Sequence, residues 1–256
     1  MIFCLFGRCL AVLGLIGGLF GGAAGASAAE FNPAQRAAII EILREAMRSD
    51  PTILRDAIEA MRSEESRRQE DSARTALAAM RDQLVDPADA VLGNPRGDVT
   101  VVEFFDIRCG YCRKLQPTMM ELLRKDPKIR LVLKDLPILG PASVLGAQAL
   151  LAAQAQEGQV RDGYAKLRDS LMSQTSPPTR DSLRADARRL GLDADRLLRD
   201  MDSPAVQARI DANLALAARL NIQGTPALII GETLIPGAVE VAELQTAVRQ
   251  ARGARQ

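Results

Sequence analysis

A nearly continuous apolar run leads directly into two closely spaced cysteines. Residues 99–105 have the sequence Val-Thr-Val-Val-Glu-Phe-Phe, and residues 109–112 have the sequence Cys-Gly-Tyr-Cys. The β-branched and aromatic side chains of the first segment predict a buried strand, and a helix is expected from about Arg113 to Lys125. Cys109 therefore lies where a buried strand gives way to the N-terminus of a helix.

The remaining pattern predicts an α/β fold interrupted by a helical insertion. Residues 129–134 predict a second strand, parallel to the first because a helix connects them. Only helical patterns lie between Pro141 and Leu220, after which come strands at 227–230 and 232–235 and a helix from about Val239 to Arg252. This order, β–α–β, insertion, β–β–α, is that of a thioredoxin core. We expect a domain at 87–255, with the core at 97–140 and 221–252 and the insertion at 141–220.

The spacing of the two cysteines favours redox chemistry over a structural role. The unpaired N–H groups and the dipole at a helix N-terminus stabilise a thiolate, so Cys109 is predicted to be the exposed nucleophile. Cys112 lies one turn further on and is predicted to be the buried resolving thiol, which closes the disulfide and releases a bound partner. A bridge across two residues would stabilise little. A zinc site needs four ligands, and the chain has no histidine.

Two further features lie on the predicted strands. Glu103 comes six residues before Cys109, and a carboxyl group buried there would have a raised pKa and could accept the proton of Cys112. The alternative is an edge-strand glutamate that faces solvent. The second feature is Thr225-Pro226 before the third strand, where proline is tolerated because only one donor is lost. In a thioredoxin-type core this proline is cis, and the backbone before it would hold an extended substrate.

The first 29 residues predict a cleavable signal peptide. Arg8 is the only charge before Glu30, an apolar and glycine run extends from residue 9 to 24, and Ala26-Ser27-Ala28 is a small-x-small cleavage pattern. A retained membrane anchor is the alternative. Cleavage would remove the first two of the four cysteines, so that only Cys109 and Cys112 remain in a chain exported to an oxidising compartment.

Residues 30–86 predict a helical extension that has too little apolar surface for a core of its own. Asn32 and Pro33 suit a helix start, and Ser49-Asp50-Pro51 interrupts the pattern. A stripe recurs on both sides of the break, with Ile39, Ile40, Leu43, Met47, Ile53, Leu54, Ala57, Ile58 and Met61, and a thinner part with Leu77, Met80 and Leu84. Identical stripes can pack across chains, which favours an oligomerisation segment at 33–84. A solvated helical linker is the alternative.

The charge balance argues against nucleic acid as a partner. The chain has 33 basic and 32 acidic residues, a net charge of +1, no Trp and only 3% aromatic residues, so there is no broad basic footprint and stacking groups are scarce. The absence of His excludes Ser–His and Cys–His catalysis within the chain. We expect no cofactor and no metal, with Cu(I) binding by the two thiols left open as a side activity.

Residues 90–250 resemble the DsbA family of thioredoxin-fold proteins. The resemblance rests on residues 103–105 before the cysteine pair, on Gly224-Thr225-Pro226, and on the run Lys-Asp-Leu-Pro-Ile-Leu-Gly at 134–140. It implies that Cys109, Cys112, Glu103 and Pro226 are catalytic, and that Thr225, Gly110 and Tyr111 contact substrate. The N-terminal extension is similar to that of the subgroup containing the suppressor-of-copper-sensitivity protein C, in which such a segment can build a trimer.

The resemblance implies a periplasmic thiol–disulfide interchange protein that acts on disulfide-containing exported proteins and is reset by a membrane redox partner. Gly110-Tyr111 replaces the Pro-His of the strong oxidant of the family, and threonine precedes Pro226. Without the imidazole the thiolate is less stabilised and the disulfide less oxidising. Both features favour a disulfide isomerase or reductase. A dithiol oxidase that donates disulfides, and a Cu(I)-binding protein, are the alternatives.

Overall fold

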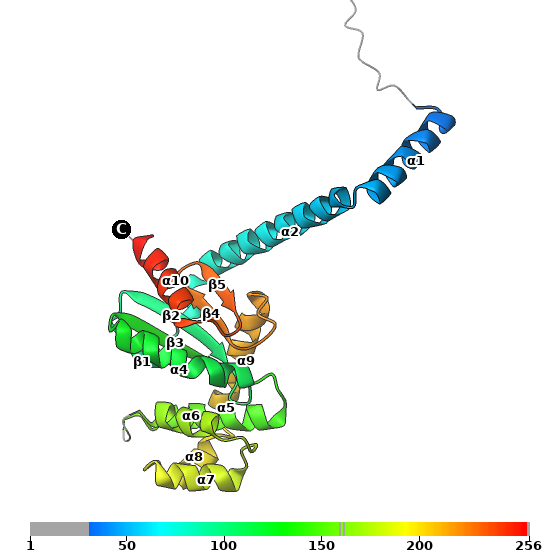
Figure 1. Cartoon of the computed structure of the whole chain (residues 1–256). Helices are drawn as coiled ribbons and strands as arrows, with labels where there is room; N and C mark the ends of the chain where they lie inside the picture. The colour runs from blue at the N-terminus through cyan, green and yellow to red at the C-terminus, as the bar shows by residue number, and fades with distance from the viewer. Residues whose placement is uncertain (1–30, 159, 161, 255–256) are drawn as a thin grey trace, which may run out of the picture. The chain divides into compact units, whose positions relative to one another are not determined.

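The computed structural model describes residues 31–158, 160 and 162–254, so the predicted signal peptide lies outside the described residues. The chain divides into two compact units between Ala60 and Met61. Within the described part of the chain, no helix has the length and apolar character needed to cross a membrane. The predicted fold class is confirmed, because a mixed sheet with an inserted set of helices follows an N-terminal helical segment (Figure 1).

The first unit consists of helix α1 (Pro33–Ser49) and the first part of helix α2 (Thr52–Ala79). Asn32 caps α1 as predicted: its side chain accepts from the Gln35 N–H, and the Gln35 side chain accepts from the Asn32 N–H. The break at Asp50-Pro51 separates the two helices. The apolar stripe of this segment is solvent-exposed and consists of Ile39, Ile40, Ile42, Leu43, Met47, Ile53, Leu54, Ile58 and Met61.

The second unit is built on a five-stranded sheet with the order β1-β3-β2-β4-β5. Its strands are β1 (Ala90–Gly93), β2 (Val99–Phe105), β3 (Ile129–Asp135), β4 (Ala227–Ile230) and β5 (Thr233–Pro236). β2 and β3 are parallel, as the strand–helix–strand rule predicts, and the other pairs are antiparallel. Strand β1 was not predicted, because its formation depends on pairing with β3 rather than on a local pattern. β5 begins at Thr233 rather than Glu232, which lies in the turn after Gly231.

Helices lie on both faces of this sheet and form the insertion. The helices that follow α2 are α3 (Arg81–Leu84), α4 (Gly110–Lys125), α5 (Pro141–Gln154), α6 (Gly163–Ser173), α7 (Arg180–Arg189), α8 (Ala194–Asp200), α9 (Pro204–Arg219) and α10 (Val241–Gly253). Helices α5 to α9 form the inserted segment between β3 and β4. In Figure 1, α6, α7 and α8 lie together at one end, while α4 and α10 lie against the sheet.

The alternation of side chains along the strands divides the apolar core in two. Val101, Phe105, Leu131 and Leu133 face α4, α10 and the first helices of the insertion, and both cysteines belong to this larger cluster. Their neighbours along the strands, such as Val102 and Val132, face the opposite side. Glu103 has the same parity as Val101 and Phe105, so its side chain lies on the face that carries the cysteines.

The opposite face of the sheet corrects one part of the sequence interpretation. Leu77, Met80 and Leu84 are buried there, against Val102, Phe104 and the end of α9. These residues were predicted to belong to the oligomerisation stripe. They are instead used within the chain, because a sheet face this apolar must be covered. The exposed stripe therefore ends near Met61, well before residue 84.

Candidate active site

The two cysteines lie at the junction of β2 with α4, where the sequence predicts them. Cys109 is the N-cap residue of α4 with an extended backbone, and Cys112 lies in the first turn. Cys112 is 0% exposed, but Cys109 is also largely covered, with 7% of its surface exposed. The thiol of Cys109 donates to the backbone carbonyl of Thr225 at an Sγ–O distance of 3.1 Å. The prediction of an exposed nucleophile is thus wrong in degree, because the Thr225 loop covers the sulfur.

The Thr225–Pro226 peptide bond is cis, as expected for a thioredoxin-type core. Pro226 is buried and immediately precedes β4, and its carbonyl accepts from the Gly237 N–H at 2.8 Å. This loop borders a groove of about 370 Å³, whose lining includes residues 221–227 of the loop with Leu234, Pro236 and Gly237 of the β5 segment. An apolar groove beside a covered thiol is suited to an extended peptide.

Burial raises the pKa of the Cys112 thiol well above its ordinary value, and the neighbouring Cys109 raises it further. Hydrogen bonds from the Asp106 backbone and from the Thr225 side chain act in the opposite direction. In the dithiol form, in which neither cysteine is bridged, Cys112 is therefore a protonated thiol at neutral pH. The two sulfurs are in different environments, which is what a nucleophile and a resolving thiol require.

The two residues between the cysteines are exposed. No heavy atom lies within 4 Å of the position that a Cβ on Gly110 would take, so this side of the turn is open to an incoming molecule. Tyr111 is 63% exposed, and the Lys114 ammonium lies 5.2 Å from the centre of its ring. A large apolar ring with a nearby cation is thus presented next to the reactive sulfur.

Two arginines attach the cysteine turn to the helical insertion. Arg108 Nη1 donates to the carbonyl of Thr175 at 2.9 Å, and Arg113 Nη1 donates to the carbonyl of Gln174 at 3.1 Å. Arg113 Nη2 also donates to the carbonyl of Arg108 at 3.1 Å. The segment that follows α6 is therefore held against the turn that contains Cys109. Neither arginine was singled out from the sequence, since nothing local marks a partner more than 60 residues away.

Glu103 is 0% exposed on a central strand, so the prediction of a buried carboxyl is confirmed and the solvent-facing alternative is wrong. Its side-chain partner is Arg168 of α6, whose Nη2 lies 3.3 Å from both carboxylate oxygens. The Arg168 side chain is 1% exposed, and its guanidinium lies 4.7 Å from the centre of the Phe105 ring. Burial raises the pKa of Glu103, and the Arg168 charge opposes that rise.

A second buried acid adjoins this pair. Asp135 at the end of β3 accepts from the Tyr164 hydroxyl at 2.9 Å, and the Asn213 side chain donates to its carbonyl at 3.1 Å. Burial raises the pKa of Asp135 to about 7, against the opposing effects of the Tyr164 hydrogen bond and the Arg168 charge. Two strand carboxyls and one guanidinium from the insertion thus share the interior behind the cysteines.

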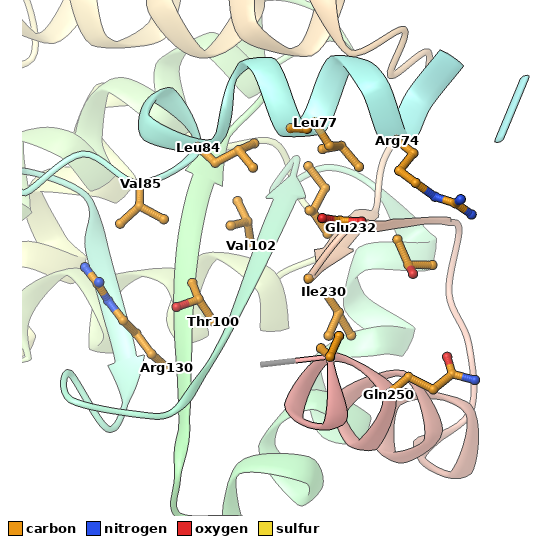
Figure 2. A pocket seen from close by; sticks show the side chains of 16 residues that line it. Arg74, Leu77, Leu84, Val85, Thr100, Val102, Arg130, Ile230, Glu232 and Gln250 are labelled. Atoms are coloured by element: carbon orange, nitrogen blue, oxygen red, sulfur yellow. The ribbon is translucent and has the colours of Figure 1, made fainter. Parts of the chain in front are cut away.

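A polar cluster of a different kind lies on the opposite face of the sheet. The ammonium of Lys134 lies 2.7 Å from Asp89, and Arg209 lies 2.8 Å from the same carboxylate. A cavity of about 760 Å³ also opens on this side. Figure 2 shows Leu77 and Leu84 on its helical wall and Thr100, Val102 and Arg130 on its strands. Neither feature contacts the cysteines, so the reactive site is confined to the α4 face.

Metal ligands do not gather at any of these places. Over residues 31–254 with the gaps noted above, no three His, Cys, Asp or Glu side chains are grouped so that they could hold a metal ion.

The comparisons with known proteins agree with this geometry. The family model for the DsbA-like thioredoxin domain matches residues 100–249. A thioredoxin-like oxidoreductase from Silicibacter pomeroyi is 43% identical, with a TM-score of 0.63, and the match covers 68% of this chain and 98% of that one. A linker-deletion and point mutant of ScsC from Proteus mirabilis is 26% identical, with a TM-score of 0.65, over 90% of this chain and all (100%) of the other.

A curated relative of different overall size also matches. The Na⁺/H⁺ antiporter NhaA 3 of Salinispora tropica is 30% identical over 169 residues, which is 65% of this chain. The chain spans only about a quarter of that protein's length (25%), so the likeness concerns one part of the antiporter. The structure places the two thiols together at a helix N-terminus, and one of them bonds to the loop that contains the cis-proline. The chain belongs to the DsbA-like thioredoxin family.

Proposed function

We propose that the chain is a periplasmic disulfide isomerase or reductase that acts on wrongly bridged exported proteins. The observation that carries this is the position of the Cys109 sulfur, which lies 3.1 Å from the carbonyl of Thr225 while Cys112 is wholly buried. In this role Cys109 is the nucleophile and Cys112 the resolving thiol. Pro226, Thr225, Gly110 and Tyr111 contact the client beside them.

The reaction begins when the Cys109 thiolate attacks one sulfur of a client disulfide. An S–S bond forms between Cys109 and the client, the client S–S bond breaks, and the second client sulfur leaves as a thiolate. In isomerisation a different client thiolate later attacks the mixed disulfide at the client sulfur. A new client disulfide then forms and Cys109 is regenerated, with no net transfer of electrons.

The resolving step accounts for reductase activity. Cys112 loses its proton and attacks the Cys109 sulfur, so that the Cys109–Cys112 disulfide forms and the client leaves with two thiols. The client gains two electrons and the chain loses two. Cys112 is easier to deprotonate at this stage, because the Cys109 sulfur that raises its pKa is no longer charged once it is bonded to the client. A dithiol redox partner in the membrane then restores the pair.

Glu103 remains the proposed acceptor of the Cys112 proton. Its carboxylate lies on the same face of the sheet as the cysteines, and the Arg168 guanidinium that bonds to it stabilises its charged form. Replacement by glutamine should slow the resolving step and leave formation of the mixed disulfide unchanged. Rapid-mixing experiments that separate the two steps would check this.

The direction of the reaction is proposed from the residues between the cysteines. Gly110 and Tyr111 supply no positive charge there, and the chain has no histidine that could do so. Less stabilisation of the Cys109 thiolate makes the dithiol a better reductant. Equilibration with glutathione is the discriminating measurement, since a strongly oxidising potential would favour the oxidase alternative.

The exposed stripe on α1 and the start of α2 supports association of several copies, with a trimer favoured. Leu43 is 52% exposed, Leu54 is 50% exposed and Met61 is 73% exposed, although side chains of this type are usually buried. Packing of such stripes between copies would remove this surface from water. An assembly of this kind would also bring several Cys109 sites to one client, which suits isomerisation.

Reactivation of scrambled ribonuclease by the chain without residues 1–29 tests the proposal. We expect activity in the wild type, none in Cys109→Ser, and retained isomerisation with lost net reduction in Cys112→Ser. Leu43→Glu should abolish both association and reactivation, whereas Ala37→Glu on the polar side of α1 should preserve both. A wild-type chain that oxidises reduced ribonuclease but fails to reactivate the scrambled form would refute the isomerase assignment.

A further inference from the structure

The aspartate that follows strand β2 is buried and binds the backbone on both sides of the active site. Asp106 is 2% exposed. Its Oδ1 accepts from the N–H of Arg108 at 2.8 Å, within the cysteine turn. Its Oδ2 accepts from the N–H groups of Ile138 and Leu139 at 2.9 and 3.1 Å, in the loop between β3 and α5. One carboxylate therefore joins the turn that carries Cys109 to a loop about 30 residues further along the chain.

The backbone of Asp106 is tied to the two cysteines themselves. Its carbonyl accepts from the N–H of Cys109 at 3.0 Å, and its N–H bonds to the Cys112 sulfur. Asp106 thus contacts the nucleophile, the resolving thiol and the neighbouring loop at once. Removal of its side chain would leave the N–H groups of Arg108 and Leu139 without their acceptor, whereas the Ile138 N–H would keep the Leu136 carbonyl at 3.0 Å, and unpaired donors are disfavoured.

The loop that Asp106 holds presents apolar side chains to solvent. Ile138 is 42% exposed and Leu139 is 54% exposed, whereas Leu136 and Pro137 just before them are buried. Leu136 continues the pairing of β3 with β2 through its N–H bond to the carbonyl of Phe105 at 2.8 Å. The sheet thus holds the start of this loop at Leu136, and the Asp106 carboxylate holds its exposed tip, Ile138–Leu139, by hydrogen bonds to both N–H groups.

We propose that Asp106 is a positioning residue that sets the exposed tip Ile138–Leu139 at a fixed place beside Cys109, so that an apolar stretch of an unfolded client rests on the tip while its disulfide meets the sulfur. The proposal rests on the proposed function, which it extends to the choice of client. A client with apolar residues near its cysteines gains from the tip. A small polar disulfide such as glutathione disulfide does not touch it.

Steady-state kinetics with two substrates test this assignment. Asp106→Ala should raise KM for insulin about five- to ten-fold, the loss expected when apolar contacts of one or two side chains are misplaced. The loss with glutathione disulfide should be at least about five-fold smaller than the loss with insulin, because glutathione disulfide is affected only by the lost bond to the Arg108 N–H in the cysteine turn and not by the tip. Equal losses with both substrates would reduce Asp106 to a structural residue and overturn the proposal.

Two matched comparisons sharpen the result. The double variant Ile138→Ser/Leu139→Ser should raise KM for insulin to the same extent, and Asp106→Ala added to it should raise KM no further, because both changes act through the tip. Additive effects would contradict the proposal. Asp126→Ala is the control: Asp126 accepts from the N–H of Lys128 at 3.0 Å in a similar turn and pairs with Arg252 at 2.9 Å, but it precedes β3 at the opposite end of the strands from the cysteines. It should leave KM for insulin unchanged.

Hydrogen exchange separates failure of this proposal from failure of the proposed function. The Leu139 amide, which donates to Asp106, should exchange at least about ten-fold faster in Asp106→Ala, because bonds to charged acceptors protect strongly. The amides of β3 should not change. This outcome is independent of turnover, so a wild-type chain inactive on both substrates would refute the function alone. An unchanged Leu139 amide would refute the role of Asp106.

Discussion

The pairing of Arg168 with Glu103 gives the most quantitative prediction. Arg168→Leu removes the guanidinium that lies over the Phe105 ring and leaves Glu103 in the interior without its counter-charge. Loss of one partner of a buried ion pair costs about 3–5 kcal/mol when the other stays charged. Neutralisation of the remaining carboxyl by protonation avoids most of that penalty. The free energy lost on substitution must therefore depend on pH.

The sign of this dependence follows from the pKa of Glu103. Burial already raises this pKa, and the Arg168 charge opposes the rise, so Arg168→Leu raises it further. Between the pKa of the unfolded chain and that of the native protein, the native state binds more protons, and its stability falls as pH increases. The maximum slope is about 1.4 kcal/mol per pH unit. From pH 5 to pH 8 the variant should thus lose up to about 4 kcal/mol more than the wild type.

Urea unfolding of the reduced protein at pH 5 and pH 8 measures the effect. Arg168→Leu should be only slightly less stable than the wild type at pH 5 and far less stable at pH 8. Adding Glu103→Gln should reduce the pH dependence of the deficit, and the remainder belongs to Asp135, because the Arg168 charge also opposes the rise in its pKa. Arg184→Met is the control: its pair with Asp195 is exposed, at 3.6 Å, and is worth at most about 1 kcal/mol. An equal deficit at both pH values would refute the reasoning.

Three further predictions concern stability. The pKa of Asp135, raised to about 7, makes the wild type lose stability as pH rises from about 4 to 7, because its native state binds an extra proton. Asp135→Asn should flatten this fall, as urea unfolding across that pH range would measure. Lys134→Met should cost about 1–3 kcal/mol in thermal unfolding, less than a fully orphaned charge, because Asp89 keeps Arg209 at 2.8 Å; insulin reduction by the intact fraction should not change. Leu84→Ala should cost about 2–5 kcal/mol at every protein concentration, whereas Ile42→Ala, at a position 67% exposed, should lower stability only at concentrations where copies associate; a cost for Ile42→Ala in dilute protein would contradict this.

The central strands and the reactive turn could be predicted from the sequence because their signals are local. Residues 99–105 and 227–230 are predominantly apolar, with β-branched and aromatic side chains, and the structure has strands with these same bounds. The cysteine pair carries its own spacing, and proline in the loop before β4 marks the opposing backbone. Strand β1 escaped prediction because its four residues pair only at the sheet edge, and that pairing is decided by β3 rather than by local pattern.

The partners of the buried charges could not be predicted, because they are set by distant contacts. Arg168 lies 65 residues from Glu103, on a helix whose charged residues have the same spacing as a solvated face. Asp106 looks like an ordinary turn residue until the loop at 138–139 is seen to donate to it. The stripe of Leu77, Met80 and Leu84 has the same period whether it packs on another copy or on this chain's own sheet. Only the apolar surface of β2 and β3 on that side decides between the two.

The helical insertion contributes to the reactive site as well as to the core. Its helix α6 supplies the one charge that balances Glu103 and the hydroxyl that binds Asp135, and the segment after α6 accepts from Arg108 and Arg113 of the cysteine turn. A thioredoxin core without the insertion would have none of these partners from α6 and the segment after it. Removal of the insertion would therefore leave two buried carboxyls without partners as well as exposed apolar surface. The charge state of the interior behind Cys112 depends on the insertion, and any change that loosens α6 is expected to alter the resolving step before it unfolds the sheet.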